Sequence, residues 1–184
     1  MKIGIISDTH GCVETWRNVY ERYFKDTELI LHAGDVLYHG PRNNIPPEYN
    51  PKALAEELNN CSVPLVIACG NCDAEVDAMV LKSPVQAPYA YVMLGQKRII
   101  VNHGHLLTEA AVWETANRMR ATLIVTGHTH VAVLKKQNGV IWLNPGSGAM
   151  SKRADGKGTA ALLEDNRVVI FDVITGEVIA EESI

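Results

Sequence analysis

The sequence lacks a long hydrophobic run, an excess of basic residues and a high content of aromatic side chains. Of its 184 residues, 6% are aromatic, and the formal net charge is -4. Such a chain has no general attraction for polyphosphate backbones and few platforms on which unpaired bases could stack. These absences argue against a nucleic-acid partner and against a nuclease.

The N-terminus lacks the features of an export signal or a membrane anchor. Its apolar run, residues 3–6, ends before Asp8 and is far shorter than a signal-peptide core or a membrane span. We therefore expect a cytoplasmic protein with no membrane partner. The four cysteines should then stay reduced, which disfavours a disulfide framework.

No repeat, low-complexity tract or linker interrupts the chain. With 47% hydrophobic and 21% charged residues, a chain of 184 residues can bury one sizeable core but is short for two ordinary domains. The composition therefore predicts a single domain over residues 1–184.

Strand-like and helix-like segments alternate in the first half of the chain. Short β-rich runs are followed by apolar residues at helical spacing, and Asn50 and Pro51 have the positions of an N-cap and a first-turn proline. This alternation predicts right-handed βαβ units in a parallel sheet covered by helices. The expected strands are residues 2–7, 29–32 and 63–69, and the expected helices are residues 13–24 and 50–60.

The second half is richer in strands. Residues 89–94 and 98–102 flank a Gly-Gln-Lys turn and predict a β-hairpin, and Thr108 is a suitable N-cap for a helix. Further apolar runs separated by turn residues predict a second, mostly antiparallel sheet. These runs are residues 122–126, 131–134, 140–143, 159–163 and 168–173.

Polar side chains follow five of the expected strands, at the point where each apolar run ends. In open α/β sheets the loops beyond the carboxyl ends of the strands converge on one crevice, so these side chains should meet. Carboxylates, imidazoles and an amide suit Mn²⁺, Fe or Zn²⁺, and a shared carboxylate can bridge two ions about 3.5 to 4 Å apart. The five segments are Asp8-Thr9-His10, Gly34-Asp35, Gly70-Asn71-Cys72-Asp73, His103-Gly104-His105 and Gly127-His128-Thr129-His130.

These segments, read as DTH, GD, GNCD, HGH and GHTH, resemble the sequence blocks of the calcineurin-like metallophosphoesterases in the same order. The similarity extends from Lys2 to about Gly148. The segments NPGS (144–147) and HGPRN (39–43) are typical of the short prokaryotic, manganese-dependent phosphodiesterase branch. The resemblance implies an α/β fold built as a four-layer α-β-β-α sandwich, in which two mixed sheets are flanked by helices.

The resemblance also implies a ligand set for two divalent metal ions. Asp35 would bridge the ions, for which Mn²⁺ is expected and Fe, Zn²⁺ and Ni²⁺ are alternatives. All seven ligand positions are filled, which disfavours a scaffold that has lost catalysis. The other ligands would be Asp8, His10 and His130 for one ion and Asn71, His103 and His128 for the other.

The function implied by the resemblance is hydrolysis of a small phosphodiester by a hydroxide that bridges the two ions. A nuclease or a cyclic-nucleotide phosphodiesterase would use the same centre, and a non-catalytic binding module would use the metals only structurally. Apolar residues on an exposed sheet face could also pair subunits as a homodimer or tetramer.

Cys69 and Cys72 have the spacing of a zinc knuckle or a thiol-disulfide motif, but no second pair completes a zinc site. Relative to the family, Cys72 stands where most members have a histidine that protonates the leaving group. A thiol is the weaker acid near neutral pH, so this substitution favours diesters with good leaving groups. Asn71, Cys72 and His105 are expected to be catalytic residues, with His105 or a metal-bound water as the substitute proton donor.

The HGPRN segment contains two candidates for binding the substrate. The guanidinium group of Arg42 has a planar fork suited to phosphate, although a solvated loop arginine would look the same in the sequence. His39 is the second candidate. Outside this segment, we expect Asp73 to cap the helix that follows it, and His32 to pack at the end of its strand more than to orient a ligand.

Overall fold

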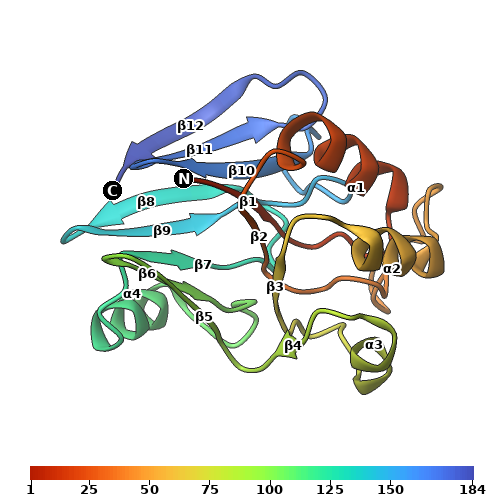
Figure 1. Ribbon diagram of the computed structural model, residues 1–184, viewed down its shortest axis with the longest axis horizontal. Helices are drawn as coiled ribbons and strands as arrows, with labels where there is room; N and C mark the ends of the chain where they lie inside the picture. The colour runs from red at the N-terminus through yellow and green to blue at the C-terminus, as the bar shows by residue number, and fades with distance from the viewer.

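Two β-sheets lie face to face at the centre of the computed structural model, which describes residues 1–184 (Figure 1). The first sheet has the strand order β12-β11-β10-β1-β2-β3-β4, and the second has the order β5-β6-β7-β9-β8. The strands are β1 (Lys2–Ile6), β2 (Leu29–His32), β3 (Leu65–Ala68), β4 (Val85–Gln86), β5 (Ala90–Leu94), β6 (Lys97–Val101), β7 (Leu123–Val125), β8 (Val133–Gln137), β9 (Val140–Asn144), β10 (Thr159–Glu164), β11 (Arg167–Asp172) and β12 (Val178–Ser183).

Helices cover the outer face of each sheet. On the first sheet lie α1 (Val13–Val19), continued by a π-helical turn η1 (Tyr20–Phe24), and α2 (Pro51–Asn60). On the second lies α4 (Glu109–Arg118), and Figure 1 shows α4 on the opposite side from α1 and α2. The predicted four-layer α/β sandwich is thus confirmed, with the short α3 (Glu75–Val80) following β3. None of these helices combines the length and the apolar character needed to cross a membrane.

The main hydrophobic core fills the space between the two sheets. Ile5 and Leu31 of the first sheet and Leu123 and Leu143 of the second are completely shielded from solvent there. A second core lies under α1 and α2, where Trp16 is buried. Because β1 and β2 are covered on both faces, they are continuous apolar runs, and this packing holds their carboxyl ends in fixed positions.

Both predicted helix caps are present. The Asn50 side chain accepts a hydrogen bond from the backbone N–H of Ala53 at 3.1 Å, and the Thr108 hydroxyl accepts one from Ala111 at 3.3 Å. Each cap satisfies a backbone donor that the first turn of a helix leaves free. The two helices therefore begin where their local sequence predicts.

The last strands belong to a different sheet from the one predicted. β10 and β11 join the first sheet, where β10 pairs antiparallel with β1. The second sheet is mixed, because β6, β7 and β9 run parallel. The prediction was wrong because β10 is buried on both faces: Ala160 packs in the core under the helices, and Ala161 packs between the sheets. Such a strand has no polar alternation that would assign it to one sheet.

Candidate metal centre

The loops that follow β1, β2, β3, β6 and β7 meet at one edge of the sheets, and several of their residues have a strained backbone. The φ angles are 54° at Asp8, 45° at His10, 56° at Asp35, 69° at His128 and 59° at His130. Residues other than glycine rarely adopt this left-handed region, and each case costs of order 1 to 3 kcal/mol. Strain of this kind, concentrated in one place, indicates a functional site.

Asp8, His10 and His130 form the first group of side chains at this site. Asp8 Oδ1 lies 3.4 Å from His130 Nε2 and 3.8 Å from His10 Nε2. The two Nε2 atoms are 3.1 Å apart. All three residues are buried, and their candidate ligand atoms lie within 4.8 Å of one another. The group therefore has the compactness of a metal site.

Asp35 connects this group to His103. Asp35 Oδ2 lies 3.7 Å from His10 Nε2 and 3.2 Å from His103 Nε2. The other carboxylate oxygen, Oδ1, accepts a hydrogen bond from the backbone N–H of Cys72 at 2.8 Å. Asp35 thus lies between two sets of nitrogen donors, which is the position required of a carboxylate shared by two ions.

Hydrogen bonds fix which nitrogen of the three buried histidines faces inward. Nδ1 of His10, His103 and His130 each donates to a backbone carbonyl, so Nε2 of the neutral ring carries a lone pair. His103 Nε2 faces the Asp35 carboxylate at 3.2 Å, and the inward lone pairs of His10 and His130 would repel each other. A divalent cation fits this donor set, because it attracts the lone pairs and the carboxylates together. The three carbonyls belong to Tyr38 at 2.7 Å, Ala33 at 2.7 Å and Met150 at 2.6 Å.

The pKa values separate the ligands that are free of protons near pH 7 from a carboxyl group that is not. Burial lowers the pKa of His130 to about 4 and also lowers that of His10, so both rings are neutral near pH 7. Burial opposes ionisation of Asp35, but His103 and the Cys72 N–H outweigh it and hold the pKa of Asp35 well below its usual range. Burial raises the pKa of Asp8 to about 7. Asp8 is therefore the carboxyl whose proton an incoming ion must displace.

Asn71 and His128, two further predicted ligands, line the cavity above the buried group. The ring of His128 is 5.3 Å from that of His103, and its backbone N–H donates to both oxygens of Asp8, at 3.2 and 3.0 Å. The side-chain nitrogen of Asn71 donates to Cys72 Sγ at 3.3 Å, which leaves its oxygen free. The structure thus gathers all seven predicted ligands, five of them buried and these two nearer the surface.

Asp73 does not cap α3, and that prediction was wrong. Its carboxylate accepts three hydrogen bonds from backbone N–H groups, those of Asp35 at 2.9 Å, Val36 at 2.7 Å and Gly70 at 2.7 Å. Asp77 bonds to the backbone at the start of α3 instead. Both roles place an aspartate between a strand and a helix, so the sequence could not separate them. Asp73 ties the loop after β3 to the loop of Asp35.

His32 orients the same loop, whereas the sequence favoured simple packing. It is buried, and burial lowers its pKa to about 3, so its ring is neutral. Its Nδ1 accepts from the Gly34 N–H at 3.1 Å, and its Nε2 donates to the Thr9 hydroxyl at 3.0 Å. The Thr9 hydroxyl in turn donates to the Val36 carbonyl at 2.9 Å. This chain of bonds joins the loop of Asp8 and His10 to that of Asp35.

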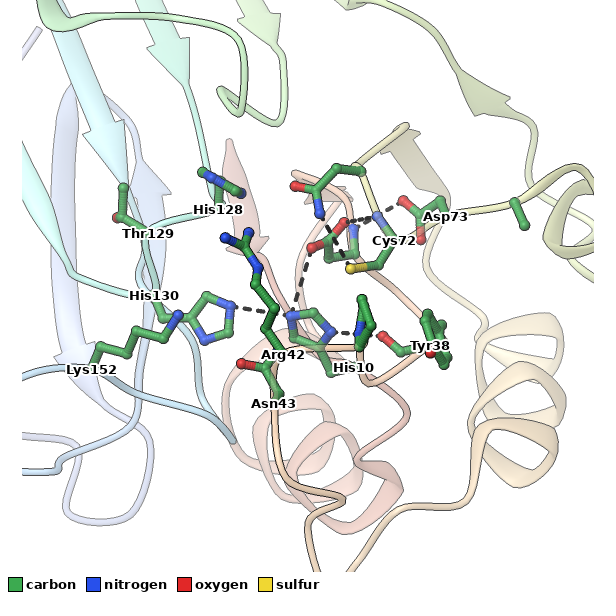
Figure 2. Close-up of a pocket in the computed structure, with 15 residues that line it drawn as sticks. His10, Tyr38, Arg42, Asn43, Cys72, Asp73, His128, Thr129, His130 and Lys152 are labelled. Carbon is green, nitrogen blue, oxygen red and sulfur yellow. Dashed lines mark hydrogen bonds and ion pairs between the residues drawn. The ribbon is translucent and has the colours of Figure 1, made fainter.

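An open cavity of about 850 Å³ lies over the centre, and Figure 2 shows the side chains that line it. Cys72 and Arg42 belong to the lining, and Cys72 Sγ lies within 4.8 Å of ligand atoms of His10 and Asp35. All four cysteines are free thiols. His39 and His105 are not part of the lining.

His39 and His105 instead pack against other rings. His39 meets Tyr49 edge to face with the ring centroids 5.1 Å apart. The ring of His105 is 5.5 Å from that of His103, and burial lowers its pKa. The Nδ1 atoms of His39 and His105 are buried without a partner. A direct contact of either side chain with a substrate would therefore need a change in its position.

Two contributors to the site were not identified from the sequence. Ser147 donates from its hydroxyl to the backbone carbonyl of Asp8 at 2.8 Å, which supports that strained residue. Ser147 belongs to the NPGS segment, so that motif could have identified it. Lys152 lines the cavity, but it lies in a polar loop without a motif, so no pattern marks it.

Gly70 has no room for a side chain. A Cβ atom there would collide with the Asp35 carboxylate and lie 2.5 Å from the Asp35 backbone nitrogen. We expect Gly70→Ala to displace Asp35 and to lower metal content and kcat, the latter by roughly ten- to hundredfold, because a misplacement of about 1 Å can have that effect. Metal analysis and turnover of the purified variant measure this.

Gly156→Ala is a matched control for that substitution. Its φ of 70° makes a side chain strained, but the position faces open space. The control should therefore lose stability while it keeps metal and turnover. Wild-type metal content and kcat in Gly70→Ala would show that the close contact with Asp35 is unimportant.

Comparisons with known proteins agree with this geometry. The sequence profile described as a calcineurin-like phosphoesterase superfamily domain matches residues 1–167. The chain is 36% identical over 154 residues to phosphodiesterase YfcE of Escherichia coli, an alignment that covers 83% of this chain and 82% of that protein. A solved structure of YfcE, a phosphoesterase from E. coli, superposes with a TM-score of 0.87 at 29% identity and covers 100% of this chain and 99% of that chain. Vacuolar protein sorting 29 from Cryptosporidium parvum, at 22% identity, shares the fold with a TM-score of 0.71 and coverage of 99% and 97%.

Proposed function

Because the chain belongs to the calcineurin-like phosphoesterase superfamily, we propose that it hydrolyses small phosphodiesters with two divalent metal ions held around Asp35. The chain is a metal-dependent phosphodiesterase by this membership and by its similarity to YfcE. The observation that supports the two-ion centre best is the convergence of three inward imidazole nitrogens and two buried carboxylates beneath an open cavity.

The seven ligands divide into two sets that share Asp35. Mn²⁺ is the ion we propose, because carboxylate, amide and imidazole donors suit it, with Fe, Zn²⁺ and Ni²⁺ as alternatives. Availability in the cell decides among these ions as much as the ligands do. The proposed first set is Asp8, His10 and His130, whose ligand atoms lie together, and the proposed second set is His103 with Asn71 and His128, which line the cavity.

The bound ions would supply the charge that activates water and neutralises the phosphate oxygens. The residues of this chain hold that arrangement in place. Backbone N–H groups of His128 and Cys72 fix the carboxylates of Asp8 and Asp35. The carbonyl partners of the three histidines fix their rings. The ligands are therefore preorganised and need little movement when the substrate enters.

Arg42 is proposed to bind the phosphate that reacts. Its guanidinium group extends toward His128 at the side of the cavity (Figure 2). Two parallel N–H donors of an arginine can bind two phosphate oxygens at once. His39 supports this loop through its backbone, since its carbonyl accepts from the Asn43 side chain at 2.8 Å. The His39 side chain itself does not line the cavity.

Cys72 makes the enzyme selective for good leaving groups. Burial and the nearby Asp35 raise the pKa of Cys72 to about 12, so the thiol is a weak acid. We expect Cys72→His to raise turnover of a glycerophosphodiester relative to bis(p-nitrophenyl) phosphate by roughly tenfold or more, because general acid catalysis typically contributes about 10² to 10⁴. The ratio of the two kcat/KM values is the measurement. Cys69→Ala is the control, since Cys69 does not line the cavity. An unchanged ratio in Cys72→His would remove Cys72 from the mechanism.

His105 is the other proposed proton donor. Its ring lies beside those of His103 and His128, at 5.5 and 6.1 Å between centroids. Burial lowers its pKa, so at neutral pH it would have to donate from a neutral ring. That makes it a weak donor as well and agrees with a preference for aryl esters.

The proposed function is tested by metal-dependent hydrolysis of bis(p-nitrophenyl) phosphate, followed by a panel of cyclic nucleotides, dinucleotides, oligonucleotides and glycerophosphodiesters. Turnover that requires added metal, with the small diesters preferred, is expected. Preference for oligonucleotides would identify a nuclease, and preference for cyclic nucleotides would identify that class of phosphodiesterase. No turnover with any of the four metals would overturn the proposal and leave a binding module.

A further inference from the structure

The cavity over the metal centre contains one more cationic side chain than the proposed chemistry uses. Three of its 15 lining residues are hydrophobic, so its wall suits a polar substrate. Its volume of about 850 Å³ is near the upper end for small-molecule sites, which leaves space beside the reacting phosphate. Arg42 and Lys152 are its cationic side chains other than histidine.

The backbones that carry these two cations are held in place. The N–H of Lys152 donates to the carbonyl of His130 at 3.1 Å. The turn that contains Arg42 is closed by the N–H of Asn43, which donates to the carbonyl of Gly40 at 3.3 Å. Lys152 is therefore attached directly to a loop that supplies a candidate ligand. Its place in the cavity wall does not depend on a free loop end.

Both side chains extend into the cavity in Figure 2, Arg42 toward His128 and Lys152 toward His130. The electrostatic effects agree with this placement. Beyond burial and neighbouring histidines, Arg42 contributes to the lowered pKa of His128, and Lys152 contributes to that of His130. Each cation thus lies near a different ligand of the centre.

No protein carboxylate neutralises this pair. Arg153, the neighbour of Lys152, forms two hydrogen bonds to Asp155 at 3.0 and 2.7 Å, and Lys152 takes no part in that pair. Asp73 also lines the cavity, but its carboxylate accepts three backbone N–H groups. Arg42 and Lys152 belong to exposed residues of the cavity wall and are therefore available to an anionic group of a substrate.

We infer that the preferred substrate is a phosphodiester that carries a further phosphate group, and that Lys152 binds this group while Arg42 faces the phosphate that reacts. The inference rests on the proposed function. Two divalent ions with Arg42 and Lys152 carry roughly six positive charges, against about five negative charges on Asp8, Asp35, Asp73, one diester and one hydroxide. A further terminal phosphate, which carries about -1.5 to -2 near neutral pH, supplies anionic charge that a simple diester lacks. A simple diester would leave Lys152 without a partner.

Linear di-adenylate with and without a 5′-phosphate is a suitable pair of probes. We expect the 5′-phosphate to raise kcat/KM roughly ten- to hundredfold, mainly through a lower KM, as charge-assisted hydrogen bonds do. Lys152→Gln should remove most of this advantage. Lys25→Gln is the matched control, because Lys25 immediately follows η1, lies outside the cavity and should leave the ratio unchanged. Raising the ionic strength should shrink the advantage in the wild type.

Binding distinguishes failure of this inference from failure of the proposed function. The metal-loaded protein is titrated by calorimetry with uncleavable methylene-phosphonate analogues of the two dinucleotides. Tighter binding of the phosphorylated analogue, reduced in Lys152→Gln, supports the inference even if turnover is slow. The inference would be overturned if the enzyme cleaved bis(p-nitrophenyl) phosphate but showed the same kcat/KM for the two dinucleotides and the same affinity for their two analogues. That result would leave the proposed function intact. Absence of all diester turnover would instead count against the proposed function.

Discussion

Asp35→Asn is expected to reduce turnover of bis(p-nitrophenyl) phosphate by about 10³-fold or more and to lower the metal content of the purified protein. Asp35 is the carboxylate between His10 and His103, at 3.7 and 3.2 Å from their Nε2 atoms. An amide in its place has no charge to share between two cations, and removal of such electrostatic stabilisation costs several kcal/mol in the transition state. Both ions should bind more weakly, because the shared ligand belongs to both sets.

The substitution is nearly isosteric, which separates chemistry from folding. The amide oxygen of an asparagine can still accept the hydrogen bond from the Cys72 N–H, which is 2.8 Å long in the wild type. Loss of a buried charge need not destabilise the metal-free fold. Asp26→Asn, at an exposed position away from the cavity, is the control. If Asp35→Asn kept wild-type metal content and more than about a tenth of the turnover, Asp35 could not be the shared ligand.

Removal of the metal ions should abolish turnover, and the affinity with which the protein binds them again should depend steeply on pH. In the metal-free protein, burial raises the pKa of Asp8 to about 7. A carboxyl group with a raised pKa keeps its proton below that pH, so an ion must displace the proton there; above it, the carboxylate is already free. We therefore expect the affinity for Mn²⁺ to fall roughly tenfold for each pH unit below about 7 and to level off above it.

One neighbouring histidine, His103, changes the pH dependence in the same direction. Asp35 and Asp8 outweigh burial and raise the pKa of His103, which adds to the competition by protons. Burial lowers the pKa of His130 to about 4, so that ring is neutral over the whole range and adds nothing. Turnover is assayed before and after the metal is removed with a chelator. Calorimetric titration of the metal-free protein with Mn²⁺ between about pH 5.5 and 8 then gives the affinity at each pH. Repeating the titration in buffers of different ionisation enthalpy gives the number of protons released on binding.

Asp8→Asn is the matched control for the pH dependence. It should bind Mn²⁺ more weakly than the wild type but with a flatter dependence on pH, since the titrating carboxyl is gone. A wild-type affinity that is constant between about pH 6 and 8 would show that Asp8 is ionised throughout that range. Turnover that survives complete removal of the metals would contradict the metal-dependent mechanism itself.

Much of the local structure could be predicted because its signals lie within a few residues. Residues 29–32 form the predicted strand β2, and Asn50 and Thr108 cap α2 and α4 as expected. Two edge strands, β4 and β12, were missed. Both lie at the ends of the first sheet, where β4 has two residues and β12 is largely exposed, so neither has the continuous apolar pattern that marks a central strand.

The composition of the site was predictable for a related reason. Carboxylates and imidazoles immediately after apolar runs identify loops at the carboxyl ends of strands, and such loops converge whatever the details of the sheet. The prediction for Asp73 failed because its partners, Asp35 and Val36, lie more than thirty residues away in the chain. Lys152 gave no signal at all, since only the fold brings its loop to His130.

The sequence by itself determined the chemical types of the donors, their order along the chain and the alternation of strands and helices, because each of these is a local property. Tertiary structure alone decided the sheet to which β10 belongs, the ring nitrogens that face inward, the charge state of Asp8 and the meeting of Arg42 with Lys152 in one cavity. Each of these depends on the burial of, or the contact between, segments that are distant in sequence. No local pattern encodes such contacts, because they form only when the two sheets pack together.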